Sequence, residues 1–131
     1  MNTDILIVGG DGDLALRKLY PAFYYLTLNG YMPENTHIFG MARSPSEQQD
    51  FINNVQEWLK GAVKELYDEK VWSEFSKRIK FVQGDSTKVE DLQRIKAECF
   101  GKDNDLIVYL AVPPSIFGKI CTALELSLIH I

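Results

Sequence analysis

The chain has few cysteines and histidines, the residues that form zinc sites and thiol redox centres. Among its 131 residues are two cysteines and two histidines, and Cys99 and Cys121 lie in no C-x-x-C pattern and near no histidine. Structural zinc sites and thiol redox motifs place such ligands about two to four residues apart. We therefore predict no metal site, and we expect both cysteines to be reduced and buried.

The sequence also lacks an excess of positive charge and any long apolar run. Its formal net charge is −4, which argues against nucleic acid or an anionic membrane surface as a partner. No segment approaches the roughly 18 consecutive apolar residues of a membrane span. The opening Met-Asn-Thr-Asp lacks the basic region of a secretion signal. We expect a cytoplasmic protein that binds neither nucleic acid nor membrane.

Four short apolar runs alternate with stretches of helical periodicity. The runs lie at 5–8, 36–41, 79–83 and 106–111. An apolar run without alternation is typical of a strand buried on both faces of a parallel sheet. The order βαβαβαβα predicts an α/β fold, a Rossmann-type doubly wound parallel sheet with right-handed crossovers. We expect one domain over residues 1–125.

The helices are predicted from capping patterns and apolar spacing. The first begins near Asp13, and Pro21 marks either a kink or a restart. Capping boxes at 44–47 and 87–90 are expected to open two later helices. The stripes predicted to face the core are Ala15, Leu19, Ala22, Phe23 and Leu26 in the first helix and Phe51, Val55, Trp58, Ala62 and Leu66 in the second.

A glycine-rich turn, 9–12, follows the first apolar run. Glycines let the chain turn sharply and let a pyrophosphate approach main-chain N–H groups at the start of the next helix. The spacing Gly-x-x-Gly-x-x-Ala is not the full Gly-x-Gly-x-x-Gly fingerprint, so a glycine turn without a ligand stays open as an alternative. Asp11 weakens the phosphate interpretation, because its carboxylate repels phosphate unless it points away or caps the helix.

Polar residues follow the later strands at the edge where doubly wound sheets bind ligands, outside the carboxyl ends of the strands. An NAD site usually has Asp or Glu after the second strand, where it binds the ribose 2′-hydroxyl. Here Arg43 stands at that point, and a guanidinium pairs instead with a 2′-phosphate. The sequence therefore predicts NADP as the cofactor.

No residue of the chain has the setting of a catalytic group. No Ser, Cys or Lys has a base partner at motif spacing, and the histidines are His37, at the start of a strand, and His130, near the C-terminus. Hydride transfer from an alcohol or hemiacetal needs a base to take the hydroxyl proton. We predict that this chain contains no catalytic residue.

Three segments carry a more specific pattern: Gly12–Pro21 (GDLALRKLYP), Gly40–Arg43 (GMAR) and Tyr109–Phe117 (YLAVPPSIF). From about residue 4 to residue 125 the chain resembles the N-terminal coenzyme domain of the glucose-6-phosphate dehydrogenase family. The resemblance implies that Arg43 holds the NADP 2′-phosphate and that Lys18 lies near the sugar phosphate. It implies coenzyme contacts at Gly9, Gly10, Gly12, Asp13, Leu14, Asp85, Ser86, Tyr109, Ala111 and Pro113.

The resemblance also implies an oxidoreductase that passes a hydride from C1 of glucose 6-phosphate to NADP, the first step of the pentose phosphate pathway. The full-length enzyme is then expected to be a homo-oligomer. The family's Glu-Lys-Pro and Arg-x-Asp-His-Tyr segments, which carry the substrate site and the catalytic pair, are absent. We expect an inactive fragment without the second, α+β domain, whose fourth strand is a bare hydrophobic edge.

Residues 126–131 (LSLIHI) leave the resemblance abruptly and match the translation of a common sequencing adapter, so we predict that they are a non-native tail. Two other functions remain as alternatives. Another NADP-dependent sugar reductase would carry a Tyr-x-x-x-Lys pair, which this sequence lacks. A non-catalytic NADP-sensing module would bind the coenzyme without any chemistry.

Overall fold

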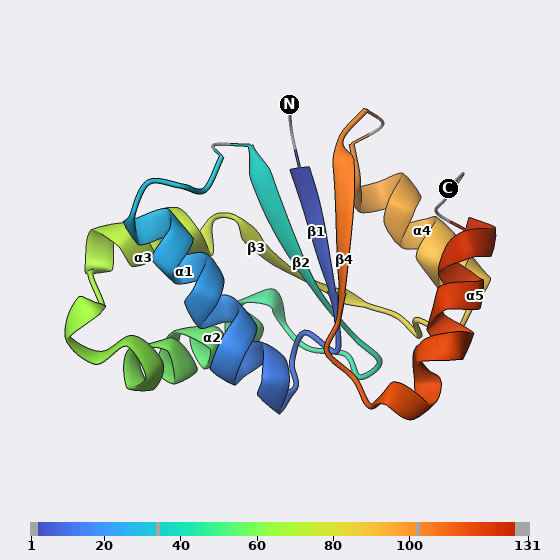
Figure 1. Ribbon diagram of the computed structural model, residues 1–131, viewed down its shortest axis with the longest axis horizontal. Helices are drawn as coiled ribbons and strands as arrows, with labels where there is room; N and C mark the ends of the chain where they lie inside the picture. The colour runs from blue at the N-terminus through green and yellow to red at the C-terminus, as the bar shows by residue number, and fades with distance from the viewer. Residues whose placement is uncertain (1–2, 34, 102, 128–131) are drawn as a thin grey trace.

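Four parallel strands form the centre of the protein (Figure 1). The computed structural model describes residues 3–33, 35–101 and 103–127. Within them the strand order is β3-β2-β1-β4. The strands are β1 (Thr3–Val8), β2 (Thr36–Ala42), β3 (Ile79–Gln83) and β4 (Asp105–Leu110). Each contains the apolar run predicted for it or all but one residue of that run, and the expected α/β class is confirmed.

The apolar run of β1 is continuous because both faces of the sheet are covered. Ile5 and Ile7 belong to the core cluster on one face, and Leu6 and Val8 belong to the cluster on the other. The strand pairs along its length with β2 on one side and β4 on the other. Its carboxyl end at Val8 therefore lies between the carboxyl ends of β2 and β4.

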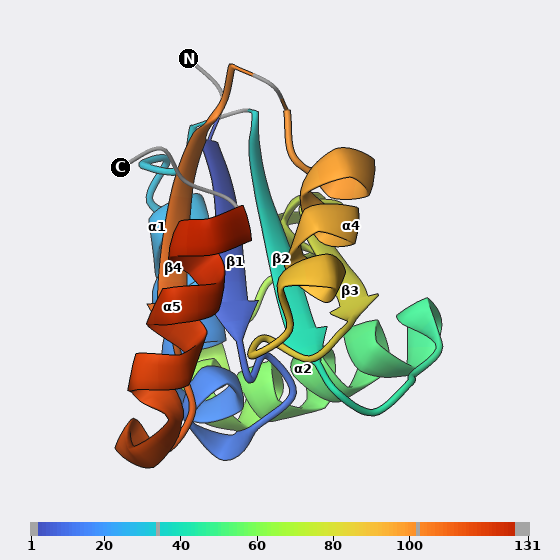
Figure 2. The same cartoon turned by 90° about the vertical axis from the view of Figure 1, so that its right-hand side faces the viewer.

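Helices cover both faces of the sheet (Figures 1 and 2). One face carries η1 (Ala15–Leu19), α1 (Tyr20–Leu28), α2 (Gln48–Val63), η2 (Lys64–Leu66) and α3 (Glu69–Ser76). The other carries α4 (Val89–Cys99) and α5 (Phe117–Ser127), the latter preceded by η3 (Pro114–Ile116). In the described part of the chain, none of these helices is long and apolar enough to cross a membrane.

The stripe predicted for the first helix is only partly correct: Ala15 and Phe23 are buried in the core and Leu19 packs against it. Helical hydrogen bonding starts at Asp13, as expected, but η1 is a π-helix. A π-turn inserts an extra residue per turn, which rotates everything after it. Ala22 and Leu26 are consequently exposed, and the residues that α1 buries are Tyr20, Pro21, Phe23, Tyr24 and Thr27.

Both predicted capping boxes are wrong. The N-cap of α2 is Glu47 and that of α4 is Lys88, each with extended backbone and without a side-chain capping bond. The Thr87 hydroxyl instead donates to the Asp85 carboxylate over 2.6 Å. Pro45 therefore lies before α2 and not in its first turn.

The second predicted stripe is correct only in its first turns. Phe51 and Val55 are buried, but Ala62 and Trp58 are exposed, and so is Leu66. The helix ends at Val63, and Lys64 has a positive φ of 51°, so the α-helical register does not continue to Leu66. The inward positions are Phe51, Ile52, Val55, Leu59 and Val63.

The strand at the open edge has the exposure expected of it. Ile107 and Tyr109 of β4 are 44% and 38% exposed, and no described strand pairs with the outer side of β4. The prediction of two buried thiols is wrong for Cys121, which lies exposed on α5, whereas Cys99 is half-buried. The reason is that Ile120 and Ala123, and not Cys121, face the sheet.

Candidate functional site

A cavity of about 250 Å³ opens at the carboxyl ends of β1, β2 and β3. It brings together residues more than 70 positions apart, among them three that the sequence predicted for the coenzyme: Gly9, Arg43 and Ser86. Its lining consists of Val8, Gly9, Asp11, Met41, Ala42, Arg43, Ser44, Gly84, Ser86, Val112 and Ile116.

The glycine turn is held against β2 by main-chain hydrogen bonds. The N–H groups of Gly9 and Gly10 both donate to the Met41 carbonyl, at 2.9 and 3.0 Å, and Gly12 N–H donates to the Gly9 carbonyl at 3.0 Å. Those three N–H groups are therefore engaged within the fold. They are not available to a ligand, whereas the prediction concerned the main-chain N–H groups at the start of the next helix.

The donors left for a ligand come from the residues around and after Gly12. Within the described part of the chain, the N–H groups of Asp11, Asp13 and Leu14 donate to no acceptor. The first N–H groups of a helix have no intrahelical partner, and together with the helix dipole they favour an anion. The start of this helix is thus the part of the loop suited to phosphate.

Gly9 and Gly10 are required by close packing. Gly9 has a φ of +80°, and a Cβ there would stand 2.5 Å from the Ala111 carbonyl oxygen. A Cβ on Gly10 would overlap the Cα of Gly40 in β2. The two glycines let the loop lie directly on its neighbouring strands.

Tyr20 is a contact that sequence reasoning missed. Its side chain is fully buried, and its hydroxyl donates to the Gly10 carbonyl over 2.7 Å. Burial raises the pKa of this hydroxyl well above its usual range, and the Asp11 carboxylate adds to the effect. The available signal was the tyrosine directly before Pro21 in the segment Gly12–Pro21.

Arg43 follows β2 directly and lines the cavity. Among the described residues, no carboxylate lies within ion-pair distance of its guanidinium. Its main-chain carbonyl is anchored by a 3.2 Å hydrogen bond from Gln83 Nε2. The side chain is thus available to a negatively charged ligand.

Asp85 and Ser86 follow β3 but play different parts. The Asp85 carboxylate accepts hydrogen bonds from the Thr87 hydroxyl and N–H, at 2.6 and 2.9 Å. These bonds hold the pKa of Asp85 below its usual value, and Arg43 and Lys88 contribute less. Ser86 is buried and lines the cavity, whereas Asp85 does not.

Comparison with known proteins shows which family the chain is similar to. Residues 6–130 match the family model described as glucose-6-phosphate dehydrogenase, NAD binding domain. The chain belongs to the glucose-6-phosphate dehydrogenase family. A nicotinamide coenzyme is therefore the class of ligand that this domain takes, and the resemblance seen in the sequence is confirmed.

Relatives of the chain are several times its length. It is 36% identical to glucose-6-phosphate 1-dehydrogenase of Dickeya dadantii over 92% of this chain and 25% of that protein. It is 38% identical to that of Saccharomyces cerevisiae over 88% of this chain and 24% of that protein. The chain thus spans about a quarter of these relatives.

Solved structures of glucose-6-phosphate dehydrogenases share the fold. The enzyme from Mycobacterium avium aligns with a TM-score of 0.85 and 26% identity, over 95% of this chain and 26% of that one. A glucose-6-phosphate dehydrogenase in complex with its substrate glucose-6-phosphate aligns with a TM-score of 0.84 and 31% identity, over 98% of this chain and 28% of that one.

Four other residues implied by the family lie outside the lining of this cavity. Ala111 donates to the Val8 carbonyl over 2.9 Å, and exposed Pro113 precedes η3. The Tyr109 ring packs edge-on against Phe23 at 5.6 Å between ring centroids. Lys18 lines a second cavity of about 490 Å³ together with Arg17, Glu57, Trp58, Gly61 and Ala62.

Proposed function

We propose that the chain is the coenzyme-binding part of an NADP-dependent glucose-6-phosphate 1-dehydrogenase. The observation that carries this is the cavity at the carboxyl ends of the strands, which is lined by Arg43 and by Gly9 and Asp11 of the loop that leads into the first helix. NADP has two anionic groups, a 2′-phosphate and a pyrophosphate. The Arg43 guanidinium is suited to the 2′-phosphate, and the N–H groups at the start of the first helix are suited to the pyrophosphate.

The residues present fit that coenzyme. The N–H groups of Asp11, Asp13 and Leu14 would hold the pyrophosphate, and Arg43 would hold the 2′-phosphate. Ser86, which is buried against the cavity, would supply a hydroxyl to the ribose or adenine side. The Asp11 carboxylate lines the same cavity, and its negative charge favours a binding mode in which the phosphates lie nearer the helix start than the Asp11 side chain.

The proposed chemistry divides between this chain and the remainder of the enzyme. When bound, the nicotinamide accepts a hydride from C1 of glucose 6-phosphate. This chain's residues bind and orient the coenzyme, which fixes its distance to the sugar. Lys18 would lie near the sugar phosphate. Most of the substrate site and the base that removes the hydroxyl proton belong to the part that the relatives have and this chain does not span, so we expect the chain alone to form no NADPH. We further propose that the full-length enzyme is a cytoplasmic homo-oligomer.

Titration of the chain with NADP and NAD tests the coenzyme assignment. We expect tighter binding of NADP, and we expect Arg43→Ala to weaken NADP by about tenfold or more because a charge-assisted contact to phosphate is lost. NAD, which lacks the 2′-phosphate, should change little. Isothermal titration calorimetry measures both affinities.

Lys96→Ala is the matched control, since it removes one positive charge from the exposed face of α4. It should leave both affinities unchanged. Equal binding of NADP and NAD by the unmodified chain, or equal loss of both in Arg43→Ala, would refute the role of Arg43. Binding of NADP by the full-length enzyme without turnover of any sugar phosphate would favour the sensing module instead.

A further inference from the structure

The main chain of Gly10 is hydrogen-bonded on both sides of its Cα. Its N–H donates to the Met41 carbonyl at 3.0 Å, and its carbonyl accepts the Tyr20 hydroxyl at 2.7 Å. The first bond joins the loop to β2, and the second joins it to α1. The orientation of the peptide that follows, Gly10–Asp11, is therefore set by a side chain from the helix.

A trans peptide fixes the consequence for the next N–H group. The C=O and N–H of one peptide unit point in opposite directions. The Gly10 carbonyl is directed at the buried Tyr20 hydroxyl, so the N–H of Asp11 is directed away from the core. Gly9 and Asp11 both line the cavity, and the Asp11 N–H is one of the donors without an acceptor in the described part of the chain.

Gly40 makes room for this contact. A Cβ at position 40 would stand 2.7 Å from the Tyr20 hydroxyl oxygen, and a Cβ on Gly10 would overlap the Gly40 Cα. Three residues farther along the chain, Arg43 lines the cavity that Gly9 and Asp11 also line. The hydroxyl thus lies against β2, the strand that Arg43 follows, while it donates to the loop.

We propose that Tyr20 is a positioning residue for the coenzyme pyrophosphate, holding the Gly10–Asp11 peptide so that its N–H and not its carbonyl faces the ligand. This rests on the proposed function of the cavity. Without the hydroxyl, the buried Gly10 carbonyl loses its donor and rotation of the peptide becomes less costly. A rotated peptide presents a carbonyl oxygen to the phosphate and repels it. Because burial keeps the pKa of Tyr20 high, the hydroxyl remains a donor across the physiological range.

Tyr20→Phe tests the proposal, since it removes the hydroxyl and keeps the ring. We expect its dissociation constants for NADP and for NAD to rise by about tenfold, corresponding to a tenfold lower population of the binding-competent loop. Equal effects on the two coenzymes are expected because both contain the pyrophosphate. This separates Tyr20→Phe from Arg43→Ala, whose effect is confined to NADP.

Tyr24→Phe is the matched control. Tyr24 is also a fully buried residue of α1, but its hydroxyl donates to the Leu66 carbonyl and accepts from Asp68 N–H, both at 2.9 Å. It should lower the unfolding temperature without changing either dissociation constant. Hydrogen exchange gives a second measurement that needs no coenzyme: the amides of residues 11–14 should show altered exchange in Tyr20→Phe and wild-type exchange in Tyr24→Phe.

The proposal is overturned if Tyr20→Phe binds both coenzymes as the unmodified chain does, because the hydroxyl then only stabilises the fold. Failure of the unmodified chain to bind either coenzyme would instead count against the proposed function. In that case hydrogen exchange decides about Tyr20: unchanged exchange at Asp11 refutes its hold on the peptide, and changed exchange supports it.

Discussion

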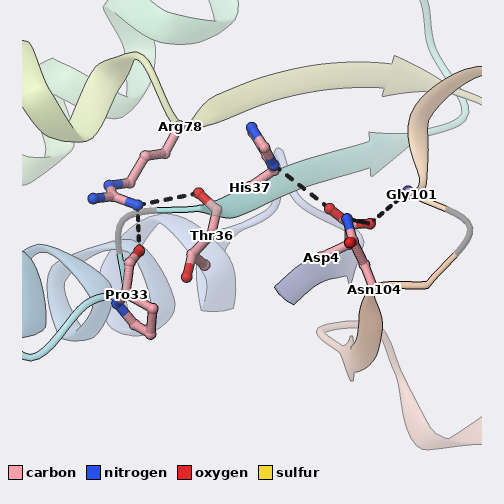
Figure 3. Close-up of polar contacts among 7 residues, drawn as sticks. All are labelled: Asp4, Pro33, Thr36, His37, Arg78, Gly101 and Asn104. Atoms are coloured by element: carbon pink, nitrogen blue, oxygen red, sulfur yellow. Dashed lines mark hydrogen bonds and ion pairs between the residues drawn. The ribbon is translucent and has the colours of Figure 1, made fainter. Parts of the chain in front are cut away.

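The two ends of the sheet are built differently. At the amino ends of the strands, side chains make the connections (Figure 3). The buried Asp4 carboxylate accepts from Gly101 N–H at 2.9 Å and from Asn104 Nδ2 at 3.1 Å, and His37 Nδ1 lies 3.6 Å from it. The buried Arg78 guanidinium donates to the carbonyl of Pro33 at 2.6 Å.

At the carboxyl ends, main-chain hydrogen bonds hold the glycine loop and the loops after β3 and β4 against the strands. Gly9 and Gly10 bond to the Met41 carbonyl, Gly84 bonds to the Ala42 carbonyl, and Ala111 bonds to the Val8 carbonyl. The Tyr20 hydroxyl of α1 also donates to the Gly10 carbonyl. Main-chain contacts of glycines occupy little volume, and a cavity lined by Arg43 and Ser86 remains at this end. Side chains at the other end fill the space between loops and stabilise the fold.

The largest effect should come from substituting a glycine at the carboxyl end. In Gly10→Ala the new methyl group overlaps the main chain of Gly40, which cannot move as a side chain can. We expect a loss of about 3 kcal/mol in the free energy of unfolding and no measurable coenzyme binding. Chemical denaturation and calorimetric titration measure the two quantities.

Gly61→Ala is the control with the same chemical change. Gly61 lies within α2, and a Cβ there meets nothing within 4 Å. The substitution should raise the free energy of unfolding by up to about 1 kcal/mol, because alanine favours helix over glycine. If Gly10→Ala were as stable as Gly61→Ala, the close contact between loop and strand would not exist.

The second prediction concerns the amino end, and it separates stability from binding. Asp4→Ala leaves Gly101 N–H and Asn104 without their acceptor, and we expect a loss of about 2 kcal/mol. The coenzyme affinity of the folded protein should stay unchanged, since the cavity lies at the opposite end of the sheet. Thermal unfolding and titration below the unfolding transition measure these.

Asp103→Ala is its control, because Asp103 is an exposed carboxylate of the same turn. It should change stability by less than about 0.5 kcal/mol. If Asp4→Ala lost as much coenzyme affinity as Gly10→Ala, the two ends of the sheet would be coupled. The amino end would then affect binding as well as stability.

This contrast also explains which features the sequence could predict. Strands were predictable because burial on both faces of β1 demands a continuous apolar run. The end of the sheet that carries the site was predictable too, because parallel strands place their carboxyl ends together. Arg43 and Ser86 line the cavity for that reason.

The starts of α2 and α4 and the individual donors were not predictable in the same way. Thr87 could equally cap a helix or bond Asp85, and only the path of the chain after β3 decides for Asp85. The π-turn before Pro21 rotated the face of α1, so Tyr20 reached Gly10 unforeseen. The engagement of the Gly9 and Gly10 N–H groups with Met41 depends on the distance between two strands, which local sequence does not contain.

The smallest effect expected is at Asp85, beside the cavity. Thr87→Ala removes the hydroxyl that contributes most to the lowered pKa of Asp85. A carboxyl whose pKa is lowered by folding stabilises the protein above its unfolded pKa, and this contribution is lost as the pH falls through the folded value. We therefore expect Thr87→Ala to cost about 0.5 kcal/mol at neutral pH, and the difference from the unmodified chain should shrink as the pH falls below the ordinary aspartate value of 3.8.

Denaturation at a series of pH values measures this difference, with Thr122→Ala as the control. The Thr122 hydroxyl donates to the Gly118 carbonyl at 2.9 Å within α5, and since no carboxylate is involved, its cost should not vary with pH. If the free energy of unfolding of Thr87→Ala differed from that of the unmodified chain by the same amount at acid pH, the hydroxyl would stabilise the turn itself and not the charge of Asp85. Coenzyme affinity should hardly change in either variant, because the Asp85 carboxylate is bonded within its own turn and does not line the cavity.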